Sequence, residues 1–199
     1  MTAFHRLLAL GLLAALSACS LLPEAEAVRV FGLPEPAIAR QAAGPAPDGV
    51  LRVDTPLASR MLSGPRIAVV PQGSQISSYA GARWSDAAPR LLRDQLIEAL
   101  RQSGRVASVV SEESNLAADR VLVSDLRAFQ ARYVDGRPEV LIRLEAQLAD
   151  GNRQVLASRQ FEVRQPSEGE AVEEVVVAFG QASDRLGQAL VDWVATQGR

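Results

Sequence analysis

Three long β-type runs separated by two tight turns restrict the fold of this chain more than any other feature. The runs cover residues 120–133, 139–149 and 154–164. Asp135-Gly136 separates the first two runs and Asp150-Gly151-Asn152 separates the last two, and both sequences are typical of hairpin turns. We therefore expect two successive antiparallel hairpins.

The middle run shows the alternation most clearly. Its apolar residues occupy every second position and predict one buried face: Val140, Ile142, Leu144, Ala146 and Leu148. The other positions are mostly charged or polar, and Leu141 is the exception that indicates a second covered surface. At ~3.3 Å per residue the run reaches ~35 Å, so we expect the hairpins to extend beyond the covering helices.

Two segments with one apolar side predict helices. The first spans about 86–103, with a cap from the Ser-Asp pair at 85–86 and Gly104 as its stop. The second spans about 170–196, after a capping-box sequence at 167–170. Its predicted apolar face is Val172, Val175, Val176, Phe179, Leu186, Leu190, Trp193 and Val194.

Shorter runs complete the prediction of an α/β domain with a mixed sheet, long antiparallel hairpins and helices packed on its faces. Four of them predict strands, at residues 28–33, 50–54, 66–70 and 106–110. The last of these follows the first helix and gives a β-α-β unit. One helical turn is expected at 58–62, an irregular connection at 34–49, and a loop at 71–82 with a short strand near 76–79.

The N-terminus has the pattern of an export signal. An apolar run at 7–16 follows Arg6 and is too short to span a membrane, which takes ~20 apolar residues. Leu16-Ser17-Ala18-Cys19 follows, with the leucine and two small residues that precede the acylated cysteine of bacterial lipoproteins. We expect cleavage between Ala18 and Cys19 and lipid on the Cys19 thiol. The alternative is a plain secretory leader with an incidental cysteine.

This leader divides the chain into a signal peptide at 1–18, a lipidated tether at 19–27 and a single domain at 28–199. Ser20 follows the cysteine. In the sorting pattern of many Gram-negative bacteria a serine there allows transfer to the outer membrane, whereas aspartate retains the protein at the inner membrane. We therefore expect the mature protein on the inner leaflet of the outer membrane, facing the periplasm.

Composition excludes several kinds of site from the mature chain. His5 and Cys19 are the only histidine and cysteine, so cleavage would leave no Ser-His-Asp triad, no Cys/His zinc site and no internal disulfide. The chain has no lysine and therefore no Walker A phosphate loop. A net charge of −2 argues against a nucleic-acid partner. The adjacent pairs Glu112-Glu113 and Glu173-Glu174 are interpreted as solvated surface. We predict no catalytic residue, no metal and no cofactor.

Residues 79–84, Tyr-Ala-Gly-Ala-Arg-Trp, are the most distinctive stretch of the mature chain. Tyrosine, tryptophan and arginine are favoured anchors of protein interfaces, so Tyr79, Arg83 and Trp84 are the candidate partner-binding residues. The alternative is that Trp84 packs at the start of the first helix and Tyr79 packs on the sheet edge. Trp193 is expected in the core.

Several short patterns follow the segment from Leu16 to Cys19, which is called a lipobox, in a fixed order. They are Phe31-x-Leu33-Pro34, Leu51-Arg52-Val53, Gly64 to Val69, Tyr79 to Trp84, Leu91-Leu92-x-x-Gln95-Leu96, Leu126-x-x-Phe129 and Val176 to Phe179. This order resembles the ABC-type transport auxiliary lipoprotein family, which includes paraquat-inducible protein C. The resemblance covers nearly the whole mature chain and implies an anticodon-binding-domain-like α/β sandwich.

The resemblance also implies a non-enzymatic role. Such lipoproteins accompany an inner-membrane ABC permease, its ATPase and a periplasmic MCE-domain protein that together move phospholipids or other hydrophobic molecules between membranes. The implied partners are the MCE-domain protein, the membrane through the acyl chains, and further copies of this chain around a symmetric MCE ring. Two other hypotheses stay open: an assembly lipoprotein of another envelope machine, such as lipopolysaccharide export or a secretin pilotin, and a lipid-anchored hydrolase.

Overall fold

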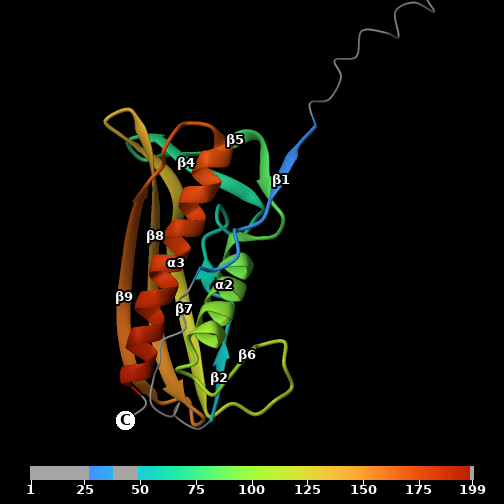
Figure 1. Cartoon of the computed structure of the whole chain (residues 1–199), viewed down its shortest axis with the longest axis vertical. Helices are drawn as coiled ribbons and strands as arrows, with labels where there is room; N and C mark the ends of the chain where they lie inside the picture. The colour runs from blue at the N-terminus through green and yellow to red at the C-terminus, as the bar shows by residue number, and fades with distance from the viewer. Residues whose placement is uncertain (1–26, 38–48, 198–199) are drawn as a thin grey trace, which may run out of the picture.

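The computed structural model describes residues 27–37 and 49–197, with the strands forming a sheet against two helices in this part of the chain (Figure 1). Ala18, Cys19, Ser20 and the middle of the irregular connection lie outside the described residues. The elements are β1 (Arg29–Phe31), β2 (Val50–Val53), β3 (Leu57–Ala58), β4 (Arg66–Gln72), β5 (Gln75–Trp84), α2 (Ala88–Ser103), β6 (Ser108–Ser111), β7 (Arg120–Val134), β8 (Arg137–Asp150), β9 (Val155–Pro166) and α3 (Val172–Thr196).

Strands β7, β8 and β9 form the two predicted antiparallel hairpins. β8 pairs along most of its length with β7 on one edge and β9 on the other. In the first turn Asp135 has a φ of 50° and Gly136 a φ of 77°, which is the backbone that a two-residue type I′ turn requires. The alternating apolar residues of β8 are buried, and Leu141 is buried on the opposite face. The prediction for this half of the sheet is confirmed.

The other edge of β7 carries three short strands in succession. β2, β3 and β4 all run parallel to β7 and pair with its beginning, its middle and its end. β6 extends the sheet beyond β2, while β5 and then β1 extend it beyond β4. The described residues thus form a mixed nine-stranded sheet that forks from one long strand, and the predicted fold class is confirmed.

Most of the segment at 71–82 is a strand, so the predicted loop is wrong, and the short strand expected near 76–79 is part of a longer one. β5 is ten residues long and pairs antiparallel with β4 through a tight turn at Gly73-Ser74. The first half of β5 consists mainly of small, polar, exposed residues, so it lacks the apolar alternation that would reveal a strand. α2 links β5 to β6 as predicted, but these strands are not neighbours in the sheet.

The helical turn predicted at 58–62 is present but begins one residue later than predicted. Leu57 and Ala58 form β3 instead. The amides of Leu62 and Ser63 then donate to the carbonyl oxygen of Ser59 at 3.0 and 2.9 Å, so the turn covers residues 59–63.

Helix α2 ends as predicted but begins differently. Gly104 terminates it with a φ of 68°, and the amide of Gly104 donates to the carbonyl of Arg101. The cap residue is Ala87, whose side chain cannot accept a hydrogen bond, so the predicted cap at 85–86 is wrong. Asp86 instead accepts a hydrogen bond from the amide of Ala87 at 2.6 Å.

Helix α3 also begins with an alanine cap. The predicted capping box at 167–170 is wrong, because the helix starts after Ala171. Glu174 supplies the capping contact by accepting a hydrogen bond from the amide of Ala171 at 3.0 Å. The whole predicted apolar face of α3 is buried, including Trp193.

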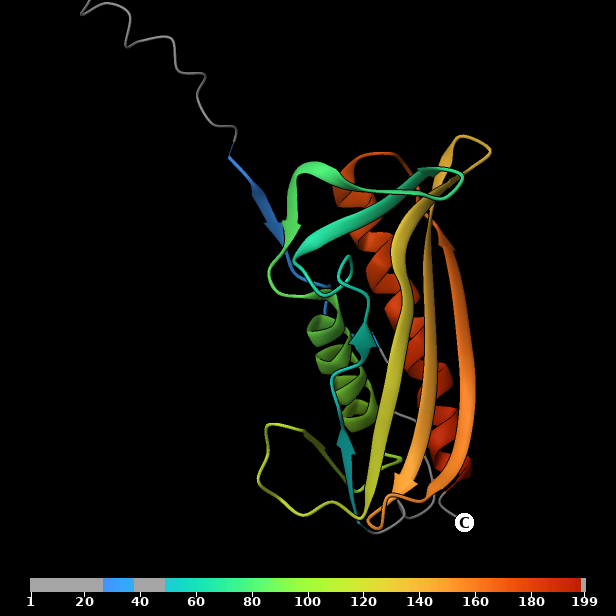
Figure 2. The ribbon, with the colours of Figure 1, turned by 180° about the vertical axis from the view of Figure 1, so that it is seen from behind.

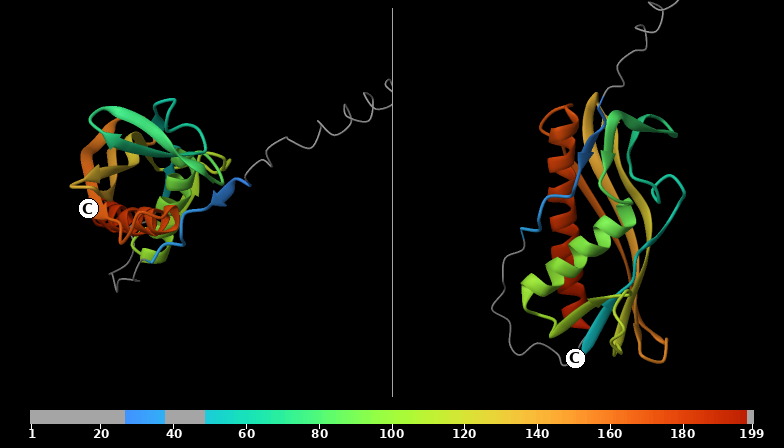
Figure 3. Two further views of the ribbon diagram at one scale, coloured as in Figure 1. Left: turned by 90° about the horizontal axis from the view of Figure 1, so that it is seen from above. Right: turned by 90° about the vertical axis from the view of Figure 1, so that its right-hand side faces the viewer.

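Both helices lie against each other on one face of the sheet, which curves around them (Figures 1 and 3). α3 packs on β8 and β9, and α2 packs on α3, β6 and β2. The turn between β7 and β8 reaches past the start of α3, as the strand lengths predict (Figure 2). The described chain begins beside β1, at the end of the molecule where α3 starts (Figure 1).

Candidate functional site

The structure separates the three candidate partner-binding residues, although all of them lie on β5. Trp84 is 1% exposed, and its ring centre lies 6.0 Å from that of Phe129 on β7 and 5.1 Å from that of Phe179 on α3. Tyr79 is half-buried and Arg83 is exposed. Trp84 therefore belongs to the core, and only Arg83 of the three lies fully at the surface. Partner binding by these residues stays a prediction.

The hydroxyl of Tyr79 is buried and has no hydrogen-bond partner among the described residues. Burial raises the pKa of Tyr79 well above its ordinary value, and the nearby Tyr133 and Glu170 side chains raise it further. The phenol is therefore neutral at physiological pH and cannot serve as a base.

A buried arginine gathers three carboxylates between α2 and the turn that follows β6. The side chain of Arg93 is 5% exposed. Its guanidinium donates to Asp94 at 2.9 Å, to Glu112 at 2.9 Å and to Glu113 at 3.1 Å. It also donates to the Thr55 hydroxyl at 3.1 Å, and that hydroxyl donates to Glu112. We call these five residues the Arg93 cluster.

The pKa shifts of Arg93 and Glu112 favour the charged form of both groups. Burial alone would lower the pKa of the Arg93 guanidinium, but its hydrogen bonds to the carboxylates hold that pKa above its ordinary value. Burial raises the pKa of Glu112, but hydrogen bonds from Thr55 and Arg93 outweigh burial, so the pKa is lowered. Glu113 is exposed as the sequence indicates, but both members of the Glu112-Glu113 pair bind Arg93. The cluster ties α2 to β6.

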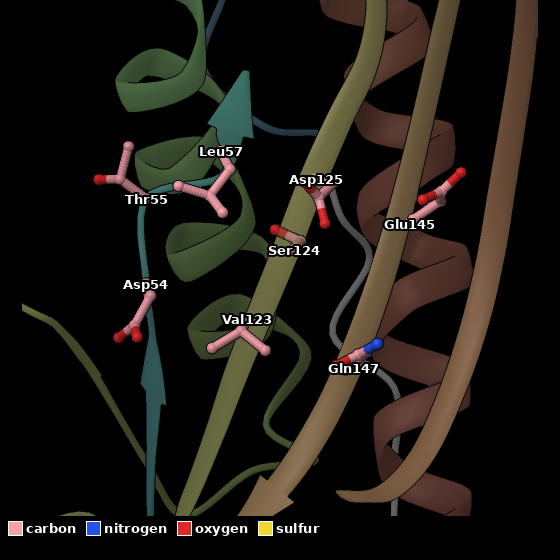
Figure 4. A pocket seen from close by; sticks show the side chains of 8 residues that line it. All are labelled: Asp54, Thr55, Leu57, Val123, Ser124, Asp125, Glu145 and Gln147. Carbon is pink, nitrogen blue, oxygen red and sulfur yellow. The ribbon is translucent and has the colours of Figure 1, made fainter. Parts of the chain in front are cut away.

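A cavity of about 390 Å³ opens beside β7, in the gap between β2 and β3 (Figure 4). Three of its lining residues carry carboxylates, so we call it the acidic notch. Its lining residues are Asp54, Thr55, Leu57, Val123, Ser124, Asp125, Glu145 and Gln147.

One extra residue in the segment between β2 and β3 creates the acidic notch. Val53 pairs with Leu122, whereas Leu57 pairs with Asp125, so four steps on this segment match three on β7. Pro56 lies in this stretch and has no N–H to donate to a neighbouring strand. The segment therefore leaves the edge of β7 and rejoins it at β3.

The three carboxylates of the acidic notch differ in their partners. Asp54 accepts a hydrogen bond from Arg52 at 2.8 Å, and Glu145 accepts one from Arg127 at 2.8 Å. Arg127 interacts electrostatically with Asp125, but no described residue forms a hydrogen bond or ion pair with the Asp125 carboxylate at the β7 wall of the acidic notch.

Within residues 27–37 and 49–197, no group of acidic, histidine or cysteine side chains is arranged to hold a metal ion. No described helix combines the length and hydropathy needed to cross a membrane. Sequence reasoning missed both the Arg93 cluster and the acidic notch, because their members come from segments far apart in the chain. Pro56 after a predicted strand is the one local signal of an interrupted sheet edge.

Comparison with known proteins gives the family. The model of the ABC-type transport auxiliary lipoprotein component matches residues 31–191. The uncharacterized protein bll6063 of Bradyrhizobium diazoefficiens is 31% identical over 144 residues, which are 72% of this chain. The chain spans 38% of the length of that curated relative.

Solved structures share the fold. The crystal structure of protein XCC0632 from Xanthomonas campestris is 30% identical, with a TM-score of 0.77 over 85% of this chain and 96% of that chain. A crystal structure of an uncharacterized protein, 20% identical, has a TM-score of 0.67 over 85% of this chain and 99% of that one. Because the family match runs from β1 into α3, the chain belongs to the family of ABC-type transport auxiliary lipoprotein components.

Proposed function

We propose that this chain is a lipid-anchored docking component, without enzymatic activity, of an ABC transport system that moves phospholipids or other hydrophobic molecules between membranes. Its partner is a periplasmic MCE-domain protein, and its membrane is the outer membrane. Family membership supports the transport setting. The lipobox that ends at Cys19 and the serine that follows it support the anchor and the location.

The observation that carries the docking role is the filled interior of the domain. A protein that carries lipid itself needs a large apolar cavity. Here Trp84, Phe129 and Phe179 pack ring against ring between the sheet and α3, and the apolar faces of both helices are buried against the strands. The acidic notch is lined mainly by polar and charged side chains. A filled core with a charged surface suits protein contact rather than lipid storage.

The short tether supports an orientation in which the β1 end of the domain lies toward the membrane. Nine steps separate Cys19 from Val28, and an extended chain covers at most ~3.5 Å per residue, so the domain begins within ~30 Å of the lipid. β1 and the start of α3 lie at this end of the domain (Figure 1). We expect the opposite end to project into the periplasm. Two or three acyl chains at ~0.8 kcal/mol per buried CH₂ hold such a protein stably.

Membrane fractionation and crosslinking test the proposal on the full-length chain expressed in its native envelope. We expect the chain in outer-membrane fractions, crosslinked to an MCE-domain protein of the same genome and to further copies of itself. Cys19→Ser removes the acylated thiol, so the variant should remain an uncleaved precursor without acyl label and lose outer-membrane recovery.

Two results would contradict the proposal. Acyl labelling of the Cys19→Ser variant would place the lipid elsewhere. Crosslinking of the wild-type chain to components of lipopolysaccharide export or a secretin, with no MCE-domain protein, would favour the assembly-lipoprotein alternative.

A further inference from the structure

We propose that the acidic notch receives an arginine or lysine side chain of the protein that this lipoprotein docks. This inference rests on the proposed docking function and specifies the chemistry of one contact in it. The charge, the unpartnered groups and the apolar rim of the acidic notch each support it.

Negative charge dominates around the acidic notch. Its walls hold the carboxylates of Asp54, Asp125 and Glu145. Thr55 in its lining joins it to the Arg93 cluster, which adds three more carboxylates. The arginines paired with these six carboxylates are Arg52, Arg93 and Arg127. A cleft lined by charges of one sign attracts the opposite charge, so the acidic notch favours a cation.

A nearly buried serine whose hydroxyl has no hydrogen-bond partner among the described residues lines the same cavity. Ser124 is 9% exposed, and its hydroxyl forms no hydrogen bond with a described residue. Figure 4 shows this hydroxyl pointing across the gap between β7 and the segment that leads to β3. Because Ser124 lines the cavity, its hydroxyl oxygen can accept a hydrogen bond from an entering N–H donor.

Two of the residues that line the acidic notch, Leu57 and Val123, are apolar, and we call them its rim. Leu57 is 71% exposed, although leucine is usually buried, and Val123 lies beside it in the lining. A bare metal ion or a small ammonium group gains nothing from such a rim. Arginine and lysine combine an aliphatic stem with a cationic head, and that combination matches an apolar rim above a carboxylate wall.

The surrounding charge favours a protein side chain over a lipid headgroup. The amine of phosphatidylethanolamine is a cation, but a phosphate accompanies it within the same headgroup. The three carboxylates that line the acidic notch would repel that phosphate. A basic side chain of a protein brings no anion of its own into the acidic notch.

Two peptides that differ only in charge provide the test. Isotope-labelled full-length chain in detergent is titrated with acetyl-Leu-Arg-Leu-amide and with the same peptide carrying citrulline, the neutral isostere of arginine. We expect the arginine peptide to shift the backbone amide resonances of Val123, Ser124 and Asp125 saturably, and the citrulline peptide to leave them unchanged. Added salt should weaken the response.

Variants of the chain show which side chains bind the arginine peptide. Asp125→Asn with Glu145→Gln should weaken arginine-peptide binding by about fivefold or more, because it removes two wall charges. Glu168→Gln with Glu170→Gln makes the same change of net charge on exposed residues elsewhere and should leave binding unchanged. Ser124→Ala should weaken binding about threefold. Ser124→Ala should not lower the unfolding temperature, because the hydroxyl has no partner among the described residues. This variant keeps the test valid if the double variant fails to fold.

Several results would overturn the inference. These are equal shifts with the citrulline peptide, arginine-peptide binding that survives the folded double variant, or displacement of the peptide by phosphatidylethanolamine bicelles. The peptide assay does not use the transport system. Crosslinking to the MCE-domain protein without any peptide response would therefore refute the inference alone, whereas a peptide response without that crosslink would refute the proposed function alone.

Discussion

Arg93 is a buried charge on which three separate segments converge. It lies 38 positions from Thr55 and 19 positions from Glu112 in the sequence. No local pattern connects such residues, because they meet only after α2 packs beside β6. The core was predictable for the opposite reason: the burial of Val140 or Leu186 follows from a repeat that each strand or helix carries within itself.

We predict that Arg93→Ala destabilises the domain by about 2 kcal/mol near pH 7, because charge-assisted hydrogen bonds are lost from a buried site. The loss should shrink in acid. The pKa of Glu112 is lowered in the folded state, so its contribution is present above the unfolded pKa near ~4.3 and disappears as pH falls through the lower folded value. Urea unfolding of both proteins between about pH 7 and pH 3 measures this difference.

Arg90→Ala is the matched control for this prediction. Arg90 lies on the same helix and pairs with Asp86 at 3.0 Å, but its side chain is 54% exposed. Exposed pairs of this kind contribute ~0.5 kcal/mol or less. A stability loss for Arg93→Ala that stayed constant down to pH 3 would show that its carboxylate partners do not stabilise the fold.

Long helices and strands were predictable where the chain repeats an apolar pattern, and β1, β2, β4 and β6 were predictable from short apolar runs. α2, α3 and β7 to β9 follow their patterns, whereas β5 depends on backbone pairing with β4 and β1. The start of α3 was mispredicted because Glu174 caps it from inside the helix. Sequence patterns also do not predict which distant segments approach each other closely. The contact between Pro34 and α3 at Gly180 is an example.

We predict that Gly180→Ala destabilises the domain by about 1 kcal/mol, although alanine usually stabilises a helix interior by a similar amount. A Cβ at Gly180 would lie 2.7 Å from Cγ and 2.9 Å from Cδ of Pro34. A proline ring cannot rotate away from this contact. A Pro34→Ala background removes both atoms and keeps only the Cβ of residue 34, which lies 3.1 Å from the added Cβ and must move by a few tenths of an ångström. Gly180→Ala should then stabilise the domain, by less than about 1 kcal/mol.

Chemical unfolding of the wild type, the two single variants and the double variant completes this cycle. The diagnostic result is that Gly180→Ala lowers the free energy of unfolding when Pro34 is present and raises it when Pro34 is replaced. Helix propensity alone would give the same change in both backgrounds. Equal effects of Gly180→Ala with and without Pro34 would show that the segment before residue 38 does not rest on α3 in solution.

β7 joins the two halves of the molecule. It pairs with β8 along one edge and with β2, β3 and β4 along the other. Short strands of two to seven residues carry too little pattern to specify a parallel partner far along the chain. The fork of the sheet, and with it the acidic notch, therefore depends on the packing of the whole chain. A strand shared in this way should also make the halves unfold together.

We therefore predict one cooperative unfolding transition for the domain, seen equally by the two tryptophans. Trp84 packs on Phe129, while Trp193 packs edge-on against Phe161 at 5.8 Å in another part of the core. Trp193→Phe and Trp84→Phe leave one reporter each, and in both variants fluorescence and circular dichroism should give the same urea midpoint. Val53→Ala, which empties part of the core beside β7, should lower stability by about 2 kcal/mol by either reporter. If Val53→Ala lowered the urea midpoint reported by Trp84 but not the one reported by Trp193, β9 and α3 would unfold separately. The shared strand would then not couple the two halves.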